Sequence, residues 1–189
     1  TPAVVLSEFM LEFIKSRGKP SAELQGEASS VLQQNPQEKA EFMANIPHLA
    51  LIKARRDAEN TGKLLDMYIN VLSTPFSALR LNKLNTRENK RALANEIYTL
   101  SQNEAYISQF IPEGMNDIKP EKIKAKLLKI ALKNDPKNNE VWRTFFPLAL
   151  KHMQQGNGSL RDVYGNLDLA KIPKEVVIKN NEKLLTSAR

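Results

Sequence analysis

The side chains of this chain that could do chemistry are mostly cationic. The sequence has 28 lysines and arginines against 21 aspartates and glutamates, two histidines and no cysteine. Without cysteine there is no disulfide, no thiolate nucleophile and no sulfur-ligated zinc. His48 and His152 have no carboxylate or second histidine at ligand spacing, so we expect neither to bind a metal. Sequence order does not test a Ser-His-Asp arrangement, but no GxSxG turn, P-loop or dinucleotide fingerprint occurs. The sequence favours a protein without catalysis or cofactor.

The first candidate binding surface is a set of lysines spaced by three or four residues, which places them on one side of one helix. This lysine stripe consists of Lys119, Lys122, Lys126, Lys129 and Lys133. It borders an apolar arc of Ile123, Leu127 and Ile130. Such a face could lie along phosphates or anionic headgroups. It could equally be a solvated face that keeps the protein soluble.

A second basic cluster precedes the stripe, with Glu88 as the only acid inside it. It consists of Arg80, Lys83, Arg87, Lys90 and Arg91. Nucleic-acid-binding surfaces interleave aromatic residues or place arginines for base contacts. Neither cluster does so, and we therefore expect a protein or a lipid surface as partner, with nucleic acid a weaker candidate.

The net charge of +7 is unevenly distributed along the chain. Residues 1–60 carry 7 basic and 8 acidic side chains, residues 61–133 carry 12 and 7, and residues 134–189 carry 9 and 6. A positive field concentrated in the middle of the chain favours acidic partners.

The pattern of apolar residues predicts an all-α fold. Apolar side chains recur at helical spacing and no stretch alternates with a period of two. Proline and capping signals predict roughly ten helices, forming a multi-helix bundle or a short irregular α-solenoid. The expected starts are Thr1-Pro2, Ser21, Asn35-Pro36, Pro47, Thr61, Thr74-Pro75, Thr86, Pro120, Ser159 and Pro173. We expect one domain over residues 1–189, with a possible division into 1–112 and 119–189.

Residues 119–153 are predicted to form the core hairpin. Asn134-Asp135-Pro136 ends its first helix, because a residue before proline is pushed out of the α region. The second helix has a broad apolar face that includes Trp142, the only tryptophan, and Phe145. So many large side chains on one helix require more than one packing neighbour. We therefore expect Trp142 to be buried.

The next expectations concern the origin of the chain and its location in the cell. No apolar run approaches the ~20 residues needed to cross a bilayer, and Glu8 and Glu12 interrupt the apolar start, which excludes a signal peptide. The chain does not begin with methionine, so we expect a piece of a longer protein. The absence of cysteine suits an intracellular, reducing compartment. The lysine- and asparagine-rich composition is compatible with a bacterial effector delivered into a host cell.

Two stretches resemble α-helical repeat proteins. The segment ALKNDPKNNEVW (131–142) is similar to the junction between tetratricopeptide-type units, and ALANEIYTLSQNEAYISQFI (92–111) is similar to an armadillo helix pair. Related helix–turn–helix segments begin at Leu32, Leu100 and Leu132, which fits a unit of about 34 residues. The resemblance implies an interaction surface. Helix–Asn–Pro–helix turns also recur in all-α proteins without repeats.

A short motif resembles a catalytic one. GSLRDVYG (158–165) is similar to the GxLRxxxT motif of secreted bacterial Rho-GAP toxins, with Gly165 where that motif has threonine. The resemblance implies that Arg161 would stabilise charge on the transferring phosphate of a GTPase. The same residues also fit a loop in which Ser159 caps a helix.

These observations favour one function and leave two alternatives. We expect a non-catalytic, helical protein-interaction domain. The first alternative is a domain that binds anionic lipids, such as phosphoinositides, through the lysine stripe. The second is a regulator of small GTPases acting through Arg161.

Overall fold

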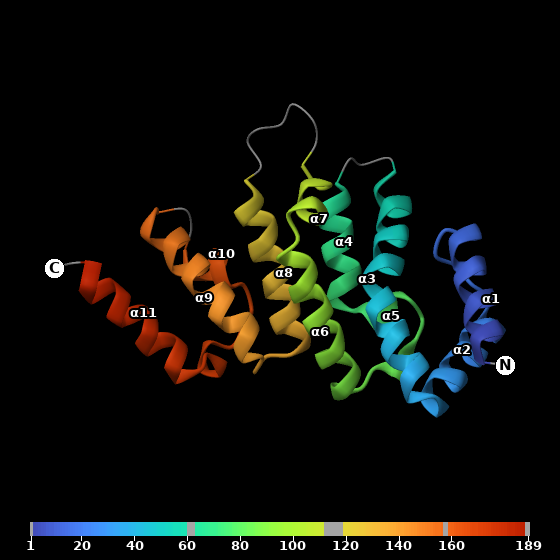
Figure 1. Ribbon diagram of the computed structural model, residues 1–189. Helices are drawn as coiled ribbons and strands as arrows, with labels where there is room; N and C mark the ends of the chain where they lie inside the picture. The colour runs from blue at the N-terminus through green and yellow to red at the C-terminus, as the bar shows by residue number, and fades with distance from the viewer. Residues whose placement is uncertain (1, 60–62, 112–118, 157–158, 188–189) are drawn as a thin grey trace. The chain divides into compact units, whose positions relative to one another are not determined.

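The computed structural model describes residues 2–59, 63–111, 119–156 and 159–187, and these ranges are all-α (Figure 1). They contain eleven α-helices, two 3-10 helices and no strand. The predicted fold class is confirmed. The chain forms two compact units, residues 1–96 and residues 97–189, with the boundary inside α6. The predicted division into 1–112 and 119–189 stays a prediction, since residues 112–118 lie outside the described residues.

Unit 1 is built around α3, which packs against α1, α2 and α4. Its elements are α1 (Pro2–Lys15), α2 (Ala22–Gln34), α3 (Pro36–Ala58), α4 (Leu64–Ser73), α5 (Pro75–Ala78), η1 (Asn82–Leu84) and the first part of α6 (Arg87–Ser101). Phe9 is fully buried and its ring lies 6.0 Å from that of Phe13 and 5.9 Å from that of Phe42. These rings join α1 to α3.

Most of the predicted helix starts in unit 1 are confirmed. The Ser21 hydroxyl accepts a hydrogen bond from the Leu24 N–H and caps α2. The Thr86 hydroxyl accepts one from the Asn89 N–H before α6. Pro75 opens α5, although the side chain of Thr74 makes no cap hydrogen bond. Thr1 and Thr61 lie outside the described residues.

The predicted break at Pro47 is wrong. Residues 36–58 form one helix, α3, with Pro47 inside it. An internal proline removes one helical hydrogen bond and costs ~3 kcal/mol. Here the helix continues because residues on both sides of Pro47, including Ile46 and Leu49, are fully buried. Pro147 likewise lies inside a continuous helix, α9.

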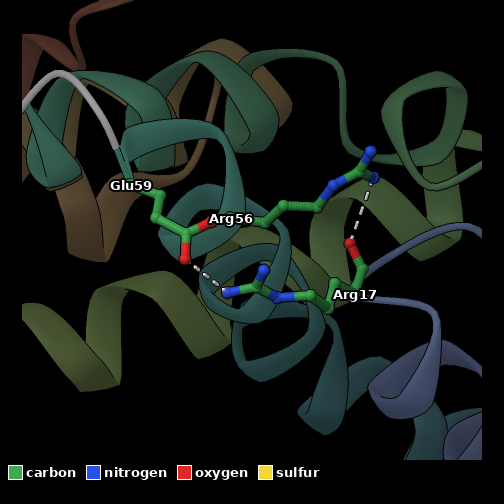
Figure 2. A network of polar contacts seen from close by, with 3 residues as sticks. All are labelled: Arg17, Arg56 and Glu59. Carbon is green, nitrogen blue, oxygen red and sulfur yellow. Dashed lines mark hydrogen bonds and ion pairs between the residues drawn. The ribbon is translucent and has the colours of Figure 1, made fainter.

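The end of α1 is closed by a left-handed residue and tied to α3. The Gly18 N–H donates to the Phe13 carbonyl at 2.8 Å and the Arg17 N–H donates to the Ile14 carbonyl at 3.2 Å, a Schellman motif. Arg17, with φ of 55°, occupies the left-handed position that usually holds glycine. Its side chain donates to Glu59 at 3.0 Å, and Arg56 donates to the Arg17 carbonyl at 3.3 Å (Figure 2).

Unit 2 is built around α9, which packs against α8, α10 and α11. Its elements are the last part of α6, α7 (Glu104–Ser108), α8 (Pro120–Asn134), α9 (Asn139–Gln154), α10 (Leu160–Tyr164), η2 (Leu169–Lys171) and α11 (Lys174–Ser187). α8 ends at Asn134 as predicted, and the Asn138 side chain caps α9 by accepting from the Val141 N–H. The sequence also predicts loops at 112–114 and 155–158; residues 112–114, 157 and 158 lie outside the described residues, and residues 155 and 156 form a turn.

Trp142 is at the centre of the α8–α9 hairpin, as predicted. Its side chain is 1% exposed, and its indole N–H donates to the Pro136 carbonyl at 2.8 Å. Its ring lies 5.9 Å from that of Phe145, which in turn meets Tyr164 of α10 edge-on at 5.8 Å. The indole therefore joins the turn between α8 and α9 to the aromatic core.

Removing the indole should strongly destabilise the protein. Trp142→Ala deletes a fully buried ring and leaves the Pro136 carbonyl without its donor, so we expect a loss of ~3–5 kcal/mol in the free energy of unfolding. Chemical denaturation followed by circular dichroism measures this. Trp142→Phe, which keeps most of the apolar volume, should cost less. A loss below ~1 kcal/mol for the alanine variant would contradict the described packing.

Gly26 offers the opposite test. It lies inside α2, and a Cβ there would meet no atom within 4 Å. Gly26→Ala should therefore raise the free energy of unfolding by ~0.5–1 kcal/mol, because alanine loses less backbone entropy in a helix. Gly18→Ala is the control. Gly18 has φ of 94° and its Cβ would lie 3.3 Å from Lys53 Cβ, so that variant should be less stable. Equal effects of the two substitutions would contradict this geometry.

Candidate functional site

The α8–α9 hairpin brings the start of α8 beside the end of α9. The two helices pack against each other and are joined by residues 135–138, so the chain reverses direction between them. Figure 1 shows α8 and α9 as neighbours in unit 2. Residues about 30 positions apart in the sequence therefore meet at one end of the hairpin.

Two adjoining hollows lie at this end of the hairpin. The first, of about 490 Å³, is lined by Lys119, Glu121, Lys122, Leu148, Lys151, His152 and Gln155. The second, of about 260 Å³, is lined by Lys122, Ala125, Lys126, Lys129, Phe145, Ala149, His152, Asp162 and Val163. They share Lys122 and His152, and we call them together the basic groove.

The basic groove contains most of the predicted lysine stripe. Four of its five lysines line the groove; Lys133 is exposed and does not. Lys151 of α9 adds a fifth lysine, and His152 of the same helix adds an imidazole. The carboxylates in the lining are those of Glu121 and Asp162. Among the described residues of the lining, five ammonium groups face two carboxylates, which gives the groove a positive field.

Lys129 is the least solvated of these lysines. Burial, and then the positive charge of Lys126, lowers the pKa of its ammonium group. Within the described part of the chain, its side chain has no ion pair that would offset the cost of burial. A half-buried ammonium group lining a hollow gains stability when an anion binds beside it.

Asp162 contributes the carboxylate of α10 to the groove, and that carboxylate is already engaged. Its Oδ2 accepts from the Ser159 N–H at 3.0 Å and from the Ser159 hydroxyl at 2.9 Å. These two hydrogen bonds, the backbone one first, lower the pKa of the Asp162 carboxyl group. The Ser159 hydroxyl also accepts from the Asp162 N–H, completing a capping box. Asp162 thus orients the start of α10.

The second predicted basic cluster belongs to unit 1, whereas the lysine stripe belongs to unit 2. Its members are exposed, except Lys90, which is half-buried. Arg80 has φ of 57° and closes the end of α5 in the way that Arg17 closes α1. Glu88, inside the cluster, lies 3.8 Å from Lys39.

Arg161, the residue of the GTPase-regulator alternative, is exposed in the first turn of α10. Ser159 caps this helix, as the capping interpretation of the sequence predicted. Gly165 has φ of 60° and ψ of −132°, a conformation in which threonine would be strained. Between the two motif positions Arg161 and Gly165, only Arg161 therefore supports the GTPase-regulator alternative.

Sequence reasoning missed two residues of the groove. The spacing of the lysines does not include Lys151, and the sequence offers His152 only as a candidate for metal binding or catalysis. The signal that could have found them is the short turn at 135–138, because a tight helix hairpin returns α9 to the start of α8. In the described residues, no group of three or more His, Asp or Glu side chains could hold a metal ion. No described helix is long and apolar enough to cross a membrane.

Comparison with known proteins places the chain in no family: no family model, no curated protein and no solved structure matches it. The geometry of the described residues is therefore the basis for any functional conclusion.

The lowered pKa of Lys129 predicts a pH dependence of stability. Between the pKa in the folded protein and the ordinary value of about 10.4, the unfolded chain binds more protons, so the lysine destabilises the fold less as the pH rises. Lys129→Met removes this effect. The stability advantage of the variant over wild type should shrink as the pH rises toward the ordinary pKa of lysine, about 10.4. Unfolding melts across this range measure it.

Tyr164, whose pKa is raised by burial, titrates in both proteins and cancels in the difference. A difference between wild type and variant that stays constant with pH would show that Lys129 is fully solvated.

Proposed function

We propose that this chain is a non-catalytic interaction domain that binds an acidic segment of a partner protein in the basic groove of unit 2. The observation that carries the proposal is the meeting of four stripe lysines with Lys151 and His152 around two adjoining hollows. A solvated face that only keeps a protein soluble needs no such convergence of two helices. The groove instead concentrates positive charge where a ligand can enter.

The lining of the groove favours a polypeptide partner. Leu148, Ala125 and Val163, which are half-buried, supply apolar surface between the lysines, so side chains of a partner can be buried while its carboxylates pair with the ammonium groups. Partial burial strengthens such ion pairs relative to fully exposed ones. The lysine stems can cover the edge of the bound segment.

An anionic membrane surface is the second candidate. The regular spacing of the lysine stripe along α8 supports it, since each lysine near an anionic leaflet contributes ~1 kcal/mol. A bilayer is broad and flat, however, whereas the groove is concave and offers its cations to a ligand that fits between α8 and α9. A single phosphorylated headgroup would fit both the concave groove and the flat surface of a bilayer.

We propose that the domain works inside a cell, its own or that of a host into which it is delivered. The absence of cysteine supports a reducing compartment. The composition that suggested a bacterial effector supports delivery into a host cell.

Neutralising the groove should weaken binding without unfolding the protein. Lys122→Gln/Lys126→Gln/Lys129→Gln removes three charges from the groove. If each ion pair contributes ~0.5–1 kcal/mol, the dissociation constant for an acidic peptide should rise about tenfold or more. The wild-type affinity should fall as salt rises, and the variant should lose most of that dependence. Fluorescence anisotropy with a labelled glutamate- and aspartate-rich peptide measures both, and thermal melts should show no loss of stability.

The matched control removes the same charge elsewhere in unit 2. Lys171, Lys174 and Lys179 are exposed, and their triple glutamine variant should bind like wild type. Equal loss in both triple variants would mean that only net charge matters, and the groove would not be the site. Flotation with phosphatidylserine and phosphoinositide vesicles tests the second candidate. Binding of vesicles but of no acidic peptide would replace the proposed partner by a membrane.

A further inference from the structure

Helix α1 of unit 1 is apolar on two opposite sides. Phe9 and Phe13 are fully buried against the rest of the unit. On the other side, Val4, Leu11 and Ile14 are 53%, 57% and 49% exposed. A helix that is apolar all round is normally covered on all sides. The three exposed side chains, which we call the α1 ridge, thus form an unpartnered face.

Two hollows flank the α1 ridge, and both are acidic. One, of about 540 Å³, lies between α1 and α2, and the other, of about 520 Å³, lies between α1 and α3. Leu11 lines both hollows. The carboxylates that line them are those of Glu8, Glu12, Glu23 and Glu27 in the first and Glu38 and Glu41 in the second.

The negative charge around the ridge arises because the acidic side chains of residues 1–45 gather there and most of the basic ones do not. Residues 1–45 contain six acidic side chains, and all six line the two hollows. The same residues contain four basic side chains, of which only Lys15 lines a hollow. Arg17 is paired with Glu59, and Lys39 approaches Glu88. A chain with a net charge of +7 therefore has one strongly negative face.

We propose that the α1 ridge is a docking site for a basic amphipathic helix of a partner protein. An apolar ridge between two hollows matches a helix that offers apolar residues at positions i, i+3 or i+4, and i+7. The carboxylates on both flanks select lysine and arginine beside that apolar row. The same carboxylates repel an anionic bilayer, whereas the lysines of the basic groove attract one. The α1 ridge and the basic groove therefore suit different ligands, and this proposal does not depend on the function proposed above.

The test uses three synthetic helical peptides of about five turns. The first has leucines in one helical row flanked by lysines. The second has glutamate in place of each lysine, and the third has the composition of the first with its leucines dispersed. Fluorescence anisotropy with the full chain should show saturable binding of the first peptide, weakened by salt. The second and third should bind at least tenfold more weakly.

Variants then locate the site. Leu11→Gln/Ile14→Gln keeps good helix formers at exposed positions and should weaken binding of the first peptide at least tenfold. The control, Leu160→Gln/Ile178→Gln, changes two equally exposed apolar residues of unit 2 and should bind like wild type. Circular dichroism checks that each variant is folded.

The charge requirement has its own pair of variants. Glu8→Gln/Glu23→Gln/Glu27→Gln should weaken binding severalfold and reduce its salt dependence. Glu12 is left intact because its carboxylate accepts a hydrogen bond from the Ser21 N–H at 2.8 Å. Glu104→Gln/Glu140→Gln/Glu182→Gln makes the same change of net charge in unit 2 and should have no effect.

Several outcomes would overturn the proposal. Failure of the first peptide to bind, equal binding of the dispersed peptide, or unchanged binding by Leu11→Gln/Ile14→Gln would each do so. Cross-linking the first peptide to wild-type chain needs no variant, and adducts outside residues 1–45 would contradict the site. Dimerisation in sedimentation that disappears in Leu11→Gln/Ile14→Gln would make a second copy the occupant. Vesicle binding that depends on the ridge would make it a membrane contact.

Discussion

The hydrogen bond from the Trp142 indole to the Pro136 carbonyl is the contact on which unit 2 most depends. It joins the turn that ends α8 to the core of α9, while the indole ring is buried against Phe145. Because the turn is held, α9 runs back along α8 and Lys151 reaches the start of that helix. The basic groove is thus a consequence of how one aromatic residue is buried, although Trp142 does not line it.

The chain combines two surfaces of opposite charge, one on each compact unit. In unit 2 the cations of α8 and α9 gather around shared hollows. In unit 1 the acids of α1, α2 and α3 gather around an apolar ridge, while the nearby arginine Arg17 turns to Glu59. The net charge of the whole chain describes neither surface. Electrostatic complementarity sets which partners dock at each, so the two surfaces are suited to different partners.

Local signals were sufficient to predict the helices but not everything that interrupts them. Ser21 and Ser159 cap helices as predicted, because the side-chain oxygen of each accepts from an N–H in the first turn that has no helical partner. Pro47 predicts a boundary for an equally local reason. It lies within α3 because burial of Ile46 and Leu49 offsets the lost hydrogen bond. That burial depends on partner helices, which local pattern does not reveal.

The candidate site was predictable to the same extent. The lysine stripe follows from spacing along one helix, and four of its members line the groove. Lys151 and His152 depend on the pairing of two helices, and the acidic flanks of the α1 ridge depend on three. Near-equal numbers of acids and bases in residues 1–60 concealed those flanks, since composition does not record which way a side chain points.

Pro147 lies between two parts of α9 that have different surroundings. The half before it holds Trp142 and Phe145 in the core, and the half after it holds Lys151 and His152 at the groove. Because proline has no N–H, the Arg143 carbonyl has no helical donor four residues on. The series of helical hydrogen bonds in α9 is interrupted there. Helices open locally where their hydrogen bonding is weakest. Local opening of α9 is therefore favoured in the turn that contains Pro147.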